Sequence, residues 1–115
     1  MTVSLQSSME WAALLKALSH HTRLQIVMEL LKGTKCVTDI QDILPASQAN
    51  ISQHLAVLRH AGVVDFAQDG ALRCYYISRP DLVEGVVNLL AADIPAVRMT
   101  KEQINQEKVK TNFSR

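Results

Sequence analysis

The spacing of apolar residues changes at Gly62, and this change limits the possible folds more than any other feature of the 115-residue chain. Through residues 47–61 the apolar side chains recur at helical spacing. Residues 63–68 and 71–77 instead alternate with a period of two, which is typical of strands. The dipeptide Asp69-Gly70 between them is a strong hairpin signal, because both residues accept positive φ. A helix followed directly by a β-hairpin is therefore expected.

Helical spacing, caps and proline breaks predict four other helices. They are a helix capped by Ser8 that runs to Leu18, one from Thr22 to Leu31, one from Asp39 to Leu44 capped by Thr38, and one from Pro80 to Ile94. Residues 34–37 tolerate a short strand, and residues 99–115 are polar, as in a frayed helix or a tail. Aromatic residues make up only 4% of the chain, which favours packed helices over a β-sandwich.

The second of these helices has an apolar face. Leu24, Val27, Met28 and Leu31 lie on this side of it at helical spacing, and Gly33 supplies the stop.

Composition excludes several classes of protein. The net charge is only +1, so a nucleic-acid-binding surface is not evident from charge, and any such function depends on pattern. The N-terminus has no basic region followed by a long apolar core, and the apolar runs are too short to span a bilayer. Two cysteines are too few for a disulfide scaffold and suit a reducing compartment. We expect a cytoplasmic protein that does not enter the membrane.

Residues 39–61 have the pattern of a helix-turn-helix. A short helix is followed by a break at Pro45-Ala46 and then by a second helix capped by Ser47. With Ile51, Leu55 and Leu58 packed inward, the outward face carries short or amide-bearing side chains: Gln48, Ala49, Ser52 and Gln53. Glutamine can bind adenine through both the carbonyl oxygen and the NH2 of its side-chain amide, and alanine can touch a thymine methyl group. Together with the hairpin as a wing, this predicts a winged helix-turn-helix.

Three segments resemble the ArsR/SmtB winged-helix repressors. They are Leu18 to Ile26, Ser47 to Val64 and Asp69 to Ile77, and the likeness extends over about residues 9–92. The resemblance implies that residues 1–95 form a DNA-binding and dimerisation domain, that residues 96–115 form a polar C-terminal tail, and that a homodimer pairs its first and last helices. The expected partner is a double-stranded DNA operator, released when an effector binds. The implied DNA contacts are Ser47, Gln48, Ala49, Asn50, Ser52, Gln53, His54, Arg59 and Arg73, with His54 and Arg59 nearer the DNA backbone.

The metal sites implied by this resemblance are incomplete here. The site at the final helix needs histidine, and residues 80–115 contain none. The site that opens the third helix needs a Cys-x-Cys pair, of which only Cys36 is present. No cofactor is therefore assigned, and ordinary metal sensing is not expected.

Cys36 and Cys74 are the candidate effector residues that remain. In the topology implied by the resemblance, the strand near Cys36 pairs with the wing strand that holds Cys74. The two could form a disulfide, could bind a thiophilic metal or metalloid, or could simply be small buried side chains. Strand alternation favours the last interpretation, because Leu72, Cys74 and Tyr76 share the face expected to point inward.

Two other functions compete with that of a DNA-binding repressor. An enzyme is not expected, since the chain lacks a Gly-rich phosphate loop, a G-x-S-x-G elbow and an H-E-x-x-H motif. A winged-helix module that binds only proteins and has no effector site stays open. A small organic ligand between the first and last helices is a further possibility for the effector.

Overall fold

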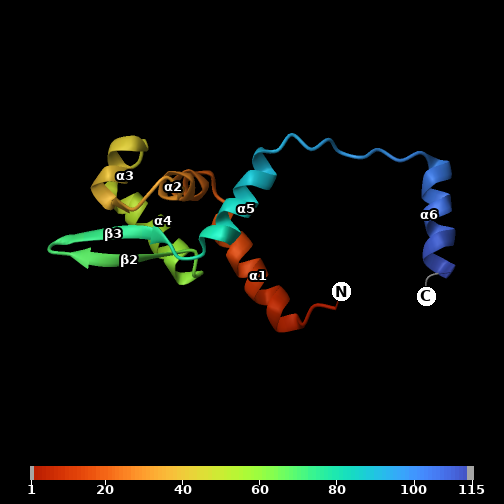
Figure 1. The fold of residues 1–115 in the computed structure, drawn as a ribbon, viewed down its shortest axis with the longest axis horizontal. Coiled ribbons are helices and arrows are strands. Elements are labelled where there is room, and N and C mark those ends of the chain that lie inside the picture. The colour runs from red at the N-terminus through yellow and green to blue at the C-terminus, as the bar shows by residue number, and fades with distance from the viewer. Residues whose placement is uncertain (1, 114–115) are drawn as a thin grey trace.

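The computed structural model describes residues 2–113 (Figure 1). Within this range the chain forms six helices and three strands in the order α1 Leu5–Leu18, α2 His21–Leu31, β1 Lys35–Cys36, α3 Val37–Ile43, α4 Gln48–His60, β2 Val64–Asp69, β3 Leu72–Ile77, α5 Pro80–Ala91 and α6 Lys101–Phe113. The helix followed by a hairpin is therefore present at the predicted place. The winged helix-turn-helix architecture predicted from the sequence is confirmed.

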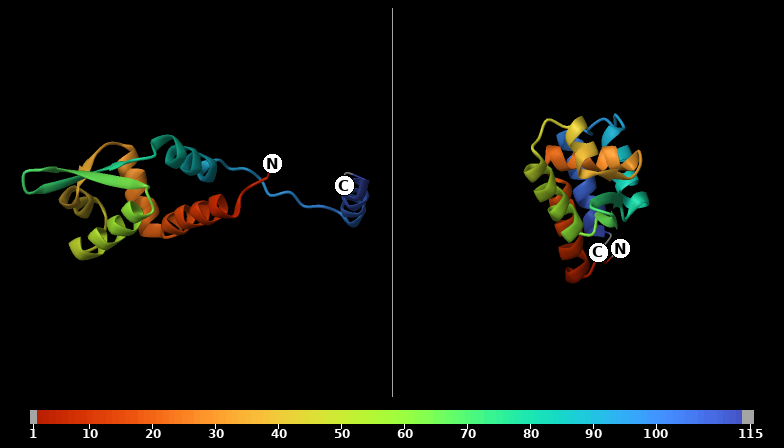
Figure 2. Two further views of the ribbon diagram at one scale, coloured as in Figure 1. Left: turned by 90° about the horizontal axis from the view of Figure 1, so that it is seen from below. Right: turned by 90° about the vertical axis from the view of Figure 1, so that its left-hand side faces the viewer.

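The three strands form one antiparallel sheet with the order β1-β3-β2. Asp69 pairs with Leu72, so the hairpin loop consists of Gly70 and Ala71, one residue later than predicted. Only Gly70 has a positive φ, of 62°, as at the first position of a type II′ turn. Asp69 stays extended because it belongs to the strand. The hairpin extends away from the helices as a wing (Figures 1 and 2).

The hydrophobic core lies where α2, α3, α4 and the sheet meet, and α1 and α5 add Leu14, Leu18 and Val83 to it. Ile51, Leu55 and Leu58 of α4 have no exposed surface, as the helical spacing predicted. Of the predicted face of α2, Val27 is buried and Leu24 and Leu31 pack against the core, whereas Met28 is 42% exposed. Ile26 and Leu30 are buried as well, because this helix contacts both α4 and β3.

Two helices begin earlier than predicted because other residues cap them. Ser4 caps α1 by accepting a hydrogen bond from the backbone N–H of Ser7 at 3.1 Å. The hydroxyl of Ser8 instead donates to the Leu5 carbonyl inside the helix. Cys36 caps α3, and its N–H donates to the Asp39 carboxylate at 2.9 Å, which is half of a capping box. Thr38 therefore lies inside α3 rather than before it.

The C-terminal part of the chain separates from the winged domain. Helix α5 ends at Ala91, three residues before the predicted end, and an extended segment leads to α6 (Figure 1). Thr100 and Gln103 exchange hydrogen bonds of 2.8 and 3.2 Å between side chain and backbone. This reciprocal cap explains an ordered helix where a frayed helix or tail was predicted.

Helices α1 and α5 project together from the end of the domain opposite the wing (Figures 1 and 2). Both carry large apolar side chains that the chain itself leaves exposed. The most exposed are Leu5, Met9, Leu15, Leu89 and Leu90, at 56–77%. Among residues 2–113, no helix is both long and apolar enough to cross a bilayer.

Candidate nucleic-acid interface

The N-terminus of α4 is fixed by its cap and by its buried face. The Ser47 hydroxyl accepts a hydrogen bond from the Asn50 N–H at 3.1 Å. Ile51 and Leu55 anchor the inner side of the helix in the core. The first turn is therefore held firmly while its outer side faces solvent.

The outer side of α4 carries the side chains predicted to face DNA bases. Residues 47–50, 52 and 53 are all exposed. Gln48 and Ser52 also line a cavity of about 790 Å³ between α4 and the wing, together with Arg59 and Arg73. We call this cavity the α4–wing groove. It places the amide, the hydroxyl and both guanidinium groups along a single channel.

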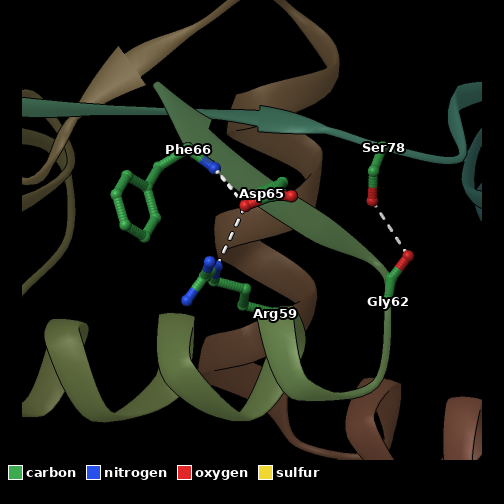
Figure 3. Close-up of polar contacts among 5 residues, drawn as sticks. All are labelled: Arg59, Gly62, Asp65, Phe66 and Ser78. Carbon is green, nitrogen blue, oxygen red and sulfur yellow. Dashed lines mark hydrogen bonds and ion pairs between the residues drawn. The ribbon is translucent and has the colours of Figure 1, made fainter. Parts of the chain in front are cut away.

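The wing is tied to α4 through Arg59 (Figure 3). The Nε of Arg59 lies 2.9 Å from the Asp65 carboxylate of β2, with both side chains about half exposed. The same carboxylate accepts the Phe66 N–H at 2.8 Å. The hydrogen bond from Arg59 lowers the pKa of Asp65 below its ordinary value. The junction is closed at its other end where the Ser78 hydroxyl donates to the Gly62 carbonyl.

Phe66 brings the two candidate arginines together. The guanidinium carbons of Arg59 and Arg73 lie 4.4 and 4.6 Å from the centroid of its ring. The ring also meets Tyr75, with centroids 5.4 Å apart. Stacking on an aromatic face holds each guanidinium in place while leaving its N–H groups free to donate. A cation from the helix and a cation from the wing thus flank one side chain.

The His54 ring, like the Arg59 side chain, is engaged within the protein. Its Nδ1 lies 3.3 Å from a guanidinium nitrogen of Arg23, and its ring centroid lies 4.5 Å from that of His20. Partial burial, the nearby His20 and Arg23 together lower the pKa of His54, with burial the largest cause. His20 in turn caps α2 by accepting from the Thr22 N–H. These contacts make His54 a support of α4, and its contact with DNA stays a prediction.

Cys36 and Cys74 face each other across β1 and β3. They are register partners in the antiparallel pair, and their sulfur atoms are 2.8 Å apart with no disulfide between them. Both side chains are partly exposed, so the expectation of two buried cysteines is wrong. The hydrogen bond to Cys74, with smaller contributions from burial and nearby charges, raises the pKa of Cys36 to about 11.

The prediction that Leu72, Cys74 and Tyr76 face inward is also wrong. Tyr75 is the buried residue, whereas Leu72 and Tyr76 are 50% and 40% exposed. The strand turns Tyr75 inward because α2 packs against this side of β3. Cys74 therefore lies on the opposite face of the strand from the core.

Sequence reasoning missed the residues that organise this surface. Phe66, Asp65 and Arg23 received no role, although each positions a candidate contact. Only the register of β2 against β3 could have indicated that Phe66 lies beside Arg73. Among the described residues, no group of three or more histidine, cysteine or acidic side chains could hold a metal ion.

Residues 20–65 match the profile described as "Bacterial regulatory protein, arsR family". The chain is 38% identical over 71 residues to the "Cadmium resistance transcriptional regulatory protein CadC homolog" of Staphylococcus aureus. This match covers 61% of the chain and 59% of that protein. It is 41% identical over 80 residues to the "Transcriptional repressor PagR" of Bacillus anthracis. This match covers 69% of the chain and 79% of that protein. The chain thus spans under two thirds of the CadC homolog but most of PagR.

Two solved structures are similar over most of the chain. The crystal structure of PagR has a TM-score of 0.67 at 39% identity and covers 76% of this chain and 99% of that one. The structure of HlyU from Vibrio cholerae has a TM-score of 0.71 at 30% identity and covers 77% of this chain and 100% of that one. The fold and the sequence therefore point to the same group of proteins.

Proposed function

Because the chain belongs to the arsR family of bacterial regulatory proteins, we propose that it is a transcriptional repressor that binds a specific DNA operator as a homodimer. The observation that carries this proposal is the α4–wing groove, in which the polar face of α4 and two stacked arginines line one channel. PagR is named a repressor and HlyU of Vibrio cholerae an activator. Repression is chosen because PagR is the more similar of the two in sequence, at 41% against 34% identity.

In this proposal α4 enters the major groove of the operator. Its exposed N-terminal residues Gln48, Ala49, Ser52 and Gln53 contact base edges. Ser47 and Asn50, at the start of the helix, lie near a phosphate, where the free N–H groups of the first turn can donate. Arg59 and Arg73 bind the sugar-phosphate backbone on the wing side, which positions the helix without reading sequence.

The homodimer is supported by the apolar surface at the other end of the domain. Leu5, Met9 and Leu15 of α1 and Leu89 and Leu90 of α5 are more than half exposed in the single chain. Apolar patches formed by neighbouring helices mark contact surfaces between proteins. Pairing of α1 and α5 across a two-fold axis would cover them and would present two α4 helices to one operator.

The effector site is proposed at Cys36 and Cys74. They are two free thiols in contact, and they join the start of α3 to the wing. A thiophilic metal or metalloid, an oxidant or a small molecule could act there, and no resident cofactor is assigned. The unlinked cysteines also support a cytoplasmic location.

The proposal is tested by selecting a duplex from a random DNA library with the reduced protein and measuring its dissociation constant. Gln48→Ala and Ser52→Ala should each weaken binding by roughly 1–3 kcal/mol, as expected for a lost base contact. Gln106→Ala is the matched control, because this exposed glutamine lies on α6, away from the groove. Equal binding by all four proteins would contradict the assignment of α4.

Salt dependence separates DNA binding from the alternative of a protein-interaction module. If Arg59 and Arg73 contact phosphates, affinity must fall steeply as salt rises, and Arg73→Gln should reduce the slope by about one. A flat response, or failure to select any duplex, would favour the alternative.

A further inference from the structure

The Cys36–Cys74 pair has the geometry of a disulfide that has not yet formed. The two residues are direct register partners on antiparallel strands, and the N–H of Cys36 is used by Asp39. Residues directly opposite each other on antiparallel strands have Cα atoms about 4.5–5.5 Å apart, which is a separation that a disulfide can span. The sulfur atoms, 2.8 Å apart, need to approach by only about 0.8 Å to reach the length of a disulfide bond.

A bound metal ion fits this pair less well than a covalent bond. Metal–sulfur bonds of roughly 2.3 Å would hold two sulfurs up to about 4.6 Å apart in a linear site. The sulfurs would have to separate, and within residues 2–113 no group of three or more histidine, cysteine or acidic side chains could hold a metal ion. The observations thus favour oxidation.

The pair also joins two parts of the proposed DNA-binding surface. Cys36 caps α3 and lines the α4–wing groove. Cys74 lies next to Arg73 on β3, whose guanidinium stacks on Phe66 in the same groove. A bond between the sulfurs would fix the wing strand to the start of the helix-turn-helix, and the chain between them contains α3, α4 and β2.

We propose that Cys36 and Cys74 are the site of a reversible intramolecular disulfide, formed by a hydroperoxide, that weakens operator binding. The effect on DNA rests on the proposed function, whereas the disulfide itself does not. In the reaction the Cys74 thiolate attacks the hydroperoxide, becomes a sulfenic acid and releases an alcohol, or water when the oxidant is hydrogen peroxide. The Cys36 sulfur then displaces water from the sulfenic acid. Two thiols and one hydroperoxide thus become one disulfide, one alcohol or water, and one further water.

The environment of the thiols supports this order of events. The pKa of Cys36 is raised to about 11, so this thiol keeps its proton at neutral pH, and we assign the first attack on the oxidant to the Cys74 sulfur 2.8 Å away. Partial exposure of both side chains admits the oxidant and, later, a dithiol reductant. The proton of Cys36 departs with the water when the disulfide forms.

The chemical half is tested on the full chain with hydrogen peroxide as the probe. The oxidised protein should lose both free thiols and the mass of two hydrogen atoms, should run as a single chain on a non-reducing gel, and should regain its thiols with dithiothreitol. Cys36→Ser and Cys74→Ser should form no such bond, and dimedone should label the sulfenic acid in Cys36→Ser more than in Cys74→Ser. Retention of both thiols, or a bond only between chains, would overturn the proposal.

The regulatory half is tested by the affinity of the same samples for the selected duplex. Oxidation should weaken binding by about tenfold, within the usual range of coupling between sites, and dithiothreitol should restore it. Both serine variants should bind as well as the reduced protein and should ignore peroxide, which also shows that they fold. A disulfide that leaves affinity unchanged would overturn the coupling. Failure of the reduced protein to bind any duplex would contradict the proposed function while leaving the thiol result to stand.

Discussion

The two ends of the winged domain contain the same kinds of apolar residue, but only one end covers them. Ile51 and Leu55 of α4 have no exposed surface, whereas Leu89 and Leu90 of α5 are about two-thirds exposed. The helix-turn-helix therefore completes its own core, and the α1/α5 end does not. The difference teaches that stability and assembly are separable here, because each depends on a different set of leucines.

The largest expected effect comes from making one substitution at both ends. Leu55→Ala should lower the free energy of unfolding by about 2–5 kcal/mol, because it leaves a cavity in a closed core. Leu90→Ala removes the same atoms from a side chain that is 68% exposed, and should cost the monomer less than about 1 kcal/mol. Urea denaturation, at a protein concentration low enough to keep both variants monomeric, measures the two losses in the free energy of unfolding. Equal losses would show that Leu90, like Val83 of the same helix, belongs to the core of a single chain.

A charge on the uncovered face should act on assembly rather than on folding. Leu90→Glu should raise the dissociation constant of the homodimer by at least about tenfold, because the carboxylate would be buried without a partner. Val97→Glu is the control, since Val97 is 87% exposed and lies in the extended segment beyond α5. Sedimentation over a range of concentrations measures both. An unchanged dimer would place the interface elsewhere.

The smallest effect on stability is expected from lowering the pH. It should arise only at the end of the domain that contains α4 and its closed core. The pKa values of His20 and His54 are both lowered, mainly by burial and also by neighbouring cations, His21 and Arg23 among them. The folded state thus binds fewer protons than the unfolded state below the ordinary histidine pKa of about 6.5. Stability from these groups is complete above that pH and is lost as pH falls through the folded pKa values.

Thermal denaturation from pH 7 to pH 5 checks this, and the melting temperature should fall. His54→Gln keeps an acceptor for Arg23 and should flatten the fall. The pKa of Asp65 is lowered by Arg59, so its contribution to stability is present above its unfolded pKa near 4 and is lost only at lower pH. Asp65→Asn should therefore leave the pH dependence of the melting temperature between pH 7 and pH 5 unchanged. An identical pH dependence for wild type and His54→Gln would contradict the role of the cluster.

Local signals made much of the fold predictable. Ser47 as a cap, the apolar spacing along α4, Gly62 as a stop and the glycine of the hairpin each act over a few residues, and the structure contains all four. The reciprocal cap at Thr100 is equally local and was overlooked. Exclusion of an enzyme is confirmed by the family, whose matched members are transcriptional regulators.

The rest depends on contacts between distant residues. The pairing of Arg23 with His54 joins residues 31 positions apart, and no local pattern encodes it. Which face of β3 turns inward depends on its packing against α2, so periodicity found this strand but not its inward face. The DNA contacts and the roles of the cysteines stay predictions.

The sheet edges limit how copies of this chain can meet. One edge, β1, is only two residues long, which is too short to template a strand from another molecule. The other edge, β2, carries carboxylates at Asp65 and Asp69, which would repel a second β2 laid beside it. Strand addition, the usual route from an open sheet to fibrous aggregates, is thereby disfavoured at both sides of the wing. The wing can therefore be exposed without strand pairing between copies of the chain.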